Sequence, residues 1–169
     1  NVDALNRLKQ VTDPASGITR FGYDADDNLT SVTDPRTKVT SYTYSGFGDL
    51  TTQTSPYTGL TATTFDSGGN LHASTDARNA IATYTLDALD RVTSAAFKIG
   101  STTDQTISFG YDSGTNGIGR LTSVSDANHS MSWSYDAQGR VTGKGQTVGT
   151  VTKTVGYGYT NGNWTSMTT

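Results

Sequence analysis

Carboxylates that follow an aromatic or aliphatic residue recur along the chain and are the first candidates for chemistry. All 15 acidic residues are Asp. The clearest pairs are Tyr23-Asp24, Phe65-Asp66, Leu86-Asp87, Tyr111-Asp112 and Tyr135-Asp136. Acid–base catalysis needs two differently tuned groups in one pocket, whereas these pairs recur at equivalent positions. The pattern therefore predicts a structural role, in which the aromatic residue packs and Asp caps a turn, and no catalytic residue.

Histidines and clustered aspartates are the next candidates, as metal ligands, but their spacing does not match that of known metal sites. His72 and His129 are the only histidines, and neither has a companion at metal-ligand spacing. Asp24, Asp26 and Asp27 crowd one turn, but they lack the ordered ligand positions and the distal Glu of a calcium loop. Cys is absent. We therefore expect no metal and no cofactor, with both histidines solvated or at a sheet edge.

Exposed aromatic residues can also bind sugars. Trp133 and Tyr157 lie in segments that alternate aromatic and small residues, such as Gly156-Tyr157-Gly158-Tyr159. Such a face could form a carbohydrate platform, although aromatic residues on one face of a strand more often pack against the protein itself. Sugar binding at Trp133 and Tyr157 is retained as the alternative function.

The composition limits the elements that could position these residues. Among 169 residues there are 19 Gly, and Thr, Ser and Gly together make up two-fifths of the chain, whereas Glu is absent. Because Asp, Ser and Thr are poor helix formers, a helical protein is excluded. The net charge is -3, with Lys and Arg scattered singly, so no basic surface for nucleic acid is expected. No apolar run approaches the roughly 18 residues of a membrane span.

A repeat explains the recurring pairs. Five anchors are spaced by 21 residues, and the later intervals are 25, 24 and 24. The eight anchors are Val2, Tyr23, Tyr44, Phe65, Leu86, Tyr111, Tyr135 and Tyr159. We expect residues 1–169 to form one tandem-repeat region of about eight repeats. The chain starts without an initiator Met or signal peptide, and we expect it to be a fragment of a longer protein.

The turn after each anchor ends in a residue that tolerates a left-handed backbone. These residues are Asn6, Asp27, Gly48, Gly69, Asp90, Gly119, Gly139 and Gly162. The sixth repeat has four extra residues within Ser113 to Gly119. An insertion tolerated at this point predicts a solvent-facing hairpin tip.

A second turn follows about six residues later, so each repeat is predicted to contain two strands and two turns. Asp13-Pro14 and Asp34-Pro35 are typical openings of this turn. Alternation before the anchors predicts one aromatic and one small, polar sheet face. Leu29 and Val32, however, are three residues apart, which would place them on opposite faces of a regular strand. A bulge or a partly buried outer face would each reconcile this spacing.

The pattern Tyr-Asp-x-x-Gly-Arg-Val-Thr at Tyr135 to Thr142 resembles the YD repeat of Rhs proteins. The segment Leu29 to Pro35 and the approach Tyr42-Thr43-Tyr44 are similar to the same family, and the resemblance covers essentially the whole chain. It implies an all-β fold of tandem antiparallel hairpins in a curved or spiralling sheet, part of a β-shell. In Rhs polymorphic toxins and insecticidal toxin complexes, such shells enclose a toxic C-terminal polypeptide, while teneurins use a similar shell for adhesion.

The resemblance predicts a non-enzymatic wall segment that encapsulates or presents a C-terminal toxin. The implied partners are the remaining repeats of the shell and the enclosed toxin domain. The implied location is outside the producing bacterium, by secretion or delivery through a secretion system. The alternative is a carbohydrate-binding or cell-adhesion module. Unpaired strands at the ends of such a sheet also make self-association through its edges an expectation.

Overall fold

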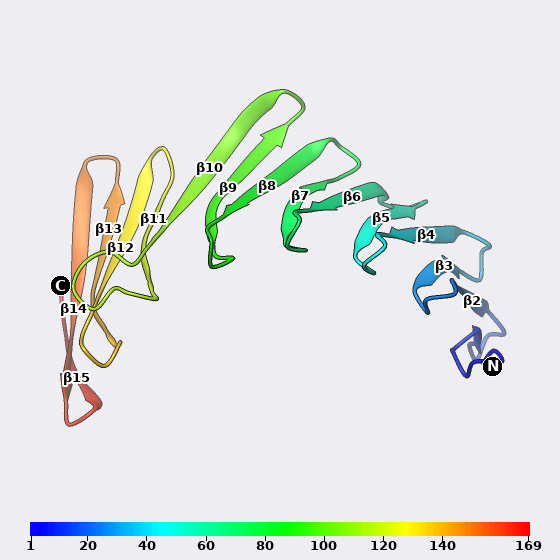
Figure 1. The fold of residues 1–169 in the computed structure, drawn as a ribbon, viewed down its shortest axis with the longest axis horizontal. Helices are drawn as coiled ribbons and strands as arrows, with labels where there is room; N and C mark the ends of the chain where they lie inside the picture. The colour runs from blue at the N-terminus through cyan, green and yellow to red at the C-terminus, as the bar shows by residue number, and fades with distance from the viewer. The chain divides into compact units, whose positions relative to one another are not determined.

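The structure, a computed structural model, describes residues 1–169 and contains strands but no helices (Figure 1). It therefore has no helix that could cross a membrane. The chain divides into two compact units, Asn1–Ala82 and Thr83–Thr169. The strands are β1 (Gln10–Thr12), β2 (Ile18–Tyr23), β3 (Leu29–Thr33), β4 (Val39–Tyr44), β5 (Leu50–Ser55), β6 (Gly59–Phe65), β7 (Leu71–Thr75), β8 (Ala80–Leu86), β9 (Val92–Ile99), β10 (Thr102–Tyr111), β11 (Leu121–Ser125), β12 (His129–Tyr135), β13 (Val141–Val148), β14 (Val151–Thr160) and β15 (Asn163–Thr168).

Within each unit, every strand pairs antiparallel with the next strand in the chain. The first unit pairs β1 through β7 in order, and the second pairs β9 through β15. β8 contains the boundary between the units. The all-β fold of tandem antiparallel hairpins predicted from the sequence is thus confirmed (Figure 1).

The two faces of the sheet differ in residue size, as the alternation predicts. In the second unit Phe109 pairs with Val124, which in turn pairs with Met131. The neighbouring pair on the other face is Gly110 with Ser123. A Cβ atom on Gly110 would collide with the Ser123 hydroxyl, so this face depends on one partner having no side chain. One face is therefore large and apolar, and the other is small and polar.

A β-bulge resolves the spacing that the sequence left open. Tyr23 pairs with Leu29, but the preceding Gly22 pairs with Ser31, so Thr30 is an additional residue in β3. Val32 pairs with Phe21, which places Leu29 and Val32 on the same aromatic face. An equivalent register shift precedes five other anchors, at Tyr44, Phe65, Tyr111, Tyr135 and Tyr159. The bulge is the correct one of the two explanations considered.

Most hairpin tips share one conformation in which the fourth of five residues is left-handed. We call the tips that follow the anchors first turns and the tips at the other end of the strands second turns. All eight residues predicted to be left-handed have positive φ, from 57° at Asp90 to 85° at Gly48. The second turns place Ser16, Thr37 and Asn79 in the same conformation, which the sequence analysis did not anticipate.

Two first turns depart from the common form. In the sixth repeat Asp112 itself has a φ of 64°, because the inserted residues lengthen the loop before Gly119. In the eighth repeat Thr160 remains in β14 and pairs with Asn163. The tip there is the two-residue turn Asn161-Gly162, with φ values of 50° and 84°. This is the Asn-Gly hairpin turn that matches the strand twist without help from an Asp cap.

Neither unit has a closed hydrophobic core. Ala95 is the only buried hydrophobic residue, with 5% exposure, and no side chain is fully buried. The aromatic face is half-buried by contacts along the sheet, as the burial of β2 and β12 shows. Because no second layer covers this face, stability must come largely from contacts between neighbouring hairpins. Some of those contacts lie at the first turns.

Candidate functional site: an aspartate, arginine and tyrosine ladder

The Asp of each regular first turn holds the backbone of that turn. In the fifth repeat, one carboxylate oxygen of Asp87 accepts hydrogen bonds from the backbone N–H groups of Leu89 and Arg91, at 2.9 and 3.1 Å. The Asp87 N–H donates to the Arg91 carbonyl at 2.9 Å and closes the loop. Asp3, Asp24, Asp66 and Asp136 make the same pair of contacts in their own turns.

The other oxygen of the Asp cap is available to an Arg at the last position of the turn. Arg91 donates from Nε to Asp87 at 2.8 Å. Its two terminal nitrogens donate to Asp112, the cap of the next repeat, at 3.1 and 2.7 Å. The same guanidinium lies 4.4 Å from the ring centroid of Tyr111. One cation thus joins two successive caps and the intervening anchor ring, an arrangement that we call a rung.

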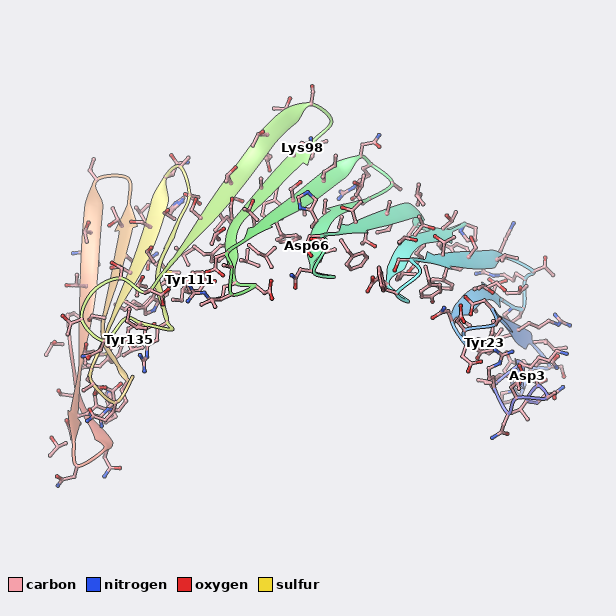
Figure 2. The ribbon with its side chains drawn as sticks, in the orientation of Figure 1. Asp3, Tyr23, Asp66, Lys98, Tyr111 and Tyr135 are labelled. Atoms are coloured by element: carbon pink, nitrogen blue, oxygen red, sulfur yellow. The ribbon has the colours of Figure 1, made fainter.

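The anchor Tyr adds a second link between repeats. The Tyr111 hydroxyl donates to the carbonyl of Val92 in the preceding repeat, at 3.0 Å. Figure 2 shows Tyr111 and Tyr135 at the first-turn end of the second unit, away from Lys98 near the opposite end. Four more anchors make this bond to the equivalent residue, Tyr23 to Leu8, Tyr44 to Leu29, Tyr135 to Leu121 and Tyr159 to Val141.

Arginines in both units make part of this arrangement, although only Arg91 bonds two successive caps. In the first, Arg7 lies 4.8 Å from the Tyr23 ring centroid and bonds its own cap Asp3 at 2.8 Å and Asp27 of the next turn at 2.6 Å. In the second, Arg140 bonds Asp136 at 2.6 Å and lies 4.4 Å from the Tyr159 centroid. Arg120 lies 5.5 Å from the Tyr135 centroid but bonds only carbonyls of its own enlarged loop.

Electrostatics favour the charged form of the Arg91 rung and of the Asp3–Arg7 pair. The hydrogen bond from Arg91 holds the pKa of both Asp87 and Asp112 below the ordinary value of 3.8. The hydrogen bond to Asp112 and, to a smaller extent, the hydrogen bond to Asp87 raise the pKa of Arg91. For Asp3, the backbone N–H of Arg7 is the main cause of a lowered pKa. These shifts suit permanent ion pairs and not a group that exchanges a proton near neutral pH.

Three successive first turns lack the Arg. Asn28 and Asn70 each donate a side-chain amide hydrogen to their own cap, Asp24 and Asp66. The third repeat exchanges the residue types, because Ser45 is the cap and Asp49 ends the turn, with the Ser45 hydroxyl donating to Asp49 at 2.9 Å. No cation is therefore supplied from Asn28, Asp49 or Asn70 to the following repeat.

The repeat itself is recognised by comparison with known sequences. The RHS Repeat family matches residues 2–38, 23–60 and 116–151, which together make up more than half of the chain. The chain belongs to the RHS repeat family. A search of curated proteins finds no significant match.

Solved structures share the fold of these RHS repeats. A Photorhabdus luminescens Tc holotoxin pore matches 89% of the chain with a TM-score of 0.70 at 15% identity. Crystal structures of TcdB2-TccC3 without its hypervariable C-terminal region and of TcdB2-TccC3-Cdc42 match 99% of the chain, with TM-scores of 0.72 and 0.73 at 14% identity. The chain spans only 9% to 11% of the length of those chains.

A similar cluster at a second turn escaped the sequence analysis of these RHS repeats. The Tyr57 hydroxyl donates to Asp34 at 2.7 Å and accepts from Arg36 at 2.6 Å, and the Arg36 guanidinium lies 5.1 Å from the Tyr57 centroid. Its hydrogen bond to Asp34 raises the pKa of Tyr57. The only sequence signal for this contact is the position of Tyr57 about one repeat after Asp34. That arrangement occurs once in the chain, so no repetition points to it.

The remaining candidate residues are not brought together. His72 occupies the bulge position that is Thr30 in the second repeat, and it is exposed. His129 contacts Asp126 at 3.1 Å at a second turn, with 54% of its side chain exposed. Trp133 pairs across β12 and β13 with Lys144, and Tyr157 lies on the next strand, β14, so both are on the same sheet. A sugar platform at Trp133 and Tyr157 stays a prediction.

Proposed function

We propose that this RHS repeat chain is a non-enzymatic wall segment of a larger shell that encapsulates or presents a toxin. The rung carries the proposal, because Arg91, Asp87, Asp112 and Tyr111 join one repeat to the next. The fold shared with TcdB2-TccC3, which has a hypervariable C-terminal region, supports a cargo at the C-terminal side of such repeats.

Containment would follow from the physical properties of the wall. Hydrogen-bonded strands present no gap between neighbours, and repeated arginine contacts hold the hairpin tips together where loop ends would otherwise fray. The partners in this proposal are further repeats of the same shell and the enclosed toxin domain. In this proposal the protein acts outside the bacterial cell that produces it, after secretion or delivery by that cell.

The test uses the product of the intact gene that encodes this chain. We expect electron microscopy to show a closed hollow particle, and limited proteolysis to leave an internal polypeptide intact until the particle is opened with denaturant. A cargo segment that is cleaved as quickly in the native particle as in denaturant would overturn containment. A control protease digestion of the isolated C-terminal segment establishes that it is cleavable when free.

The competing functions give different results with this chain. Quenching of Trp133 fluorescence by a glycan, abolished by Trp133→Ala but retained in Trp164→Ala, would favour the carbohydrate-binding alternative. Hydrolase or nuclease activity lost on a single substitution of His129 or Asp126 would favour an enzyme. We expect neither signal, because Trp133 lies opposite Lys144 in the sheet and the His129 imidazole is hydrogen-bonded to Asp126.

A further inference from the structure

The first unit contains a groove at the junction where a rung is missing. It has a volume of about 610 Å³ and lies between the first turns of the third and fourth repeats. Its lining includes Phe47 and Asp49 from the third repeat and Phe65, Asp66 and Gly69 from the fourth. These positions correspond to those that surround Arg91 in the fifth and sixth repeats.

The correspondence can be followed position by position. Asp49 ends its turn as Arg91 does, so an acid occupies the place from which a guanidinium extends elsewhere. Phe65 is the next anchor, equivalent to the Tyr111 ring that Arg91 covers. Asp66 is the next cap, equivalent to Asp112, which receives two hydrogen bonds from Arg91. The groove therefore keeps the anchor ring and the next cap of a rung, with Ser45 in place of the first Asp cap and Asp49 in place of the Arg.

The charge of the groove favours a cation. Asp49 and Asp66 are its ionisable lining residues, and no Lys or Arg lines it. Hydrogen bonds from the backbone N–H and the side-chain amide of Asn70, then from the Gly68 N–H, lower the pKa of Asp66, as does the charge of His72, so Asp66 is ionised at neutral pH. The Asn70 amide donates to the outer oxygen of Asp66 at 3.3 Å, and an incoming guanidinium would share that oxygen with it. The Ser45 hydroxyl donates to Asp49 and orients its carboxylate. A ring face beside two carboxylates is the environment that Arg prefers over Lys, because guanidinium is planar and weakly hydrated.

We propose that this groove binds a guanidinium group from outside the chain, most simply the side chain of an arginine in a partner polypeptide. The guanidinium stacks on Phe65 and pairs with Asp49 and Asp66, and so supplies in trans the ring and carboxylate contacts that Arg91 makes in cis. Phe47, which is 97% exposed at the rim, offers an apolar contact to the residue next to that arginine.

The test is a titration of the full chain with N-acetyl-arginine-methylamide, followed by amide NMR shifts. We expect saturable shifts at Phe47 to Asp49 and at Gly68 and Gly69, and none at Leu89 to Arg91, where the rung is filled. The citrulline analogue, which is uncharged but nearly isosteric, is expected to give no shifts. The lysine analogue is expected to bind several-fold more weakly. A tripeptide Leu-Arg-Leu with blocked ends distinguishes a polypeptide source, because contact with Phe47 is expected to make it bind more tightly than the single arginine.

Two variants make the test decisive. Asp49→Asn keeps an acceptor for Ser45 but removes the charge, and is expected to weaken arginine binding by about five-fold, the upper range for one exposed ion pair. Asp49→Arg combined with Phe65→Tyr supplies the rung in cis and is expected to abolish binding. Equal shifts with arginine and lysine analogues, shifts at every Asp cap, or binding unchanged in either variant would each overturn the proposal. Equal binding of the tripeptide and the single arginine would overturn the polypeptide source.

Discussion

The junction at Arg91 and the junction at Asp49 are built on the same backbone but are held together differently. Both have the five-residue turn, the left-handed fourth residue and the bulge that positions the next anchor. At Arg91 a guanidinium joins Asp87, Asp112 and Tyr111, whereas at Asp49 the equivalent space is a groove. The hairpin therefore tolerates loss of the rung, and the rung is an addition to the fold and not its cause.

A second difference shows how the groove junction compensates. The carbonyl of Val92 accepts from the Tyr111 hydroxyl, but Phe65 has no hydroxyl to offer the equivalent Leu50 carbonyl. That carbonyl instead accepts from the hydroxyl of Thr63, two residues before the anchor on the same strand face. The acceptor is thus satisfied at both junctions, by a contact from the next repeat in each case.

Acid should distinguish the two junctions most strongly. Because the folded pKa values of Asp87 and Asp112 lie below 3.8, their contribution to stability is complete above about pH 5 and is lost as the pH falls through those folded values. We expect the midpoint of thermal unfolding to be flat between pH 8 and about pH 5 and to fall steeply below pH 3.8.

Hydrogen exchange during the same titration locates the effect. As the pH falls below about 5, amides of the Asp87–Arg91 and Asp112–Arg120 tips are expected to lose more protection than those of the Ser45–Asp49 and Asp66–Asn70 tips. Only the former lose ion pairs to Arg, whereas Asp66, whose pKa is also lowered, loses hydrogen bonds within its own turn. A midpoint that also falls between pH 8 and pH 5 would contradict the assignment to these carboxylates. Equal losses of protection at both sets of tips would remove the distinction between the junctions.

Removing one rung should have the next largest effect. Arg91→Met keeps the length of the side chain but leaves Asp87 and Asp112 without their guanidinium partner and uncovers the Tyr111 ring. We expect the loss in unfolding temperature to be several times that of Arg78→Met, whose side chain is 81% exposed and pairs with a single carboxylate, Asp76. Comparable losses for the two variants would show that the rung adds nothing beyond a surface ion pair.

The backbone of the turn, in contrast, should matter at both kinds of junction, although a Cβ atom at Gly139 would also displace the Arg120 guanidinium and one at Gly48 would not meet a close neighbour. Gly139 and Gly48 have φ values of 82° and 85°, one beside Arg140 and the other beside the groove. We expect Gly139→Val and Gly48→Val each to destabilise by about 1 to 3 kcal/mol, because a β-branched residue is strained in this region. Chemical denaturation measures the change, with Gly46→Val as control, since Gly46 lacks a positive φ and has open space around it. A small loss at one glycine only would mean that its turn relaxes to a different form.

The ease of predicting these turns, and the difficulty of predicting the rung, have the same physical origin. A left-handed residue is specified locally, so the Gly, Asn and Asp types after each anchor indicate it from sequence. Thr37 was not predicted to be left-handed, because β-branched residues disfavour a positive φ. Its φ of 63° is imposed by the geometry of the repeated turn. The rung joins Arg91 to Asp112 across 21 residues, and no local rule pairs them. The spacing of Leu29 and Val32 suggests a bulge as one of two explanations, and only the strand register decides between them.

The anchor hydroxyl should give a smaller loss at the rung junction. Tyr111→Phe removes only the hydroxyl that bonds the Val92 carbonyl, and we expect it to destabilise by about 0.5 to 1.5 kcal/mol. The matched control is Tyr42→Phe on β4, whose hydroxyl makes no hydrogen bond to the protein and whose loss should change the unfolding free energy by a few tenths of a kcal/mol at most. Similar losses in the two variants would mean that the hydroxyl contact is not stabilising.

The reverse substitution in the groove should have almost no effect by itself. Phe65→Tyr offers a hydroxyl to the Leu50 carbonyl, but Thr63 already donates there, so we expect a change of no more than about 0.5 kcal/mol. Thr63→Val, which keeps the shape and removes the donor, should cost about 0.5 to 1.5 kcal/mol in the natural background and clearly less in the Phe65→Tyr background. Additive losses in this double-mutant cycle would show that Thr63 and the anchor hydroxyl do not serve the same carbonyl, and the compensation between the two junctions would have to be abandoned.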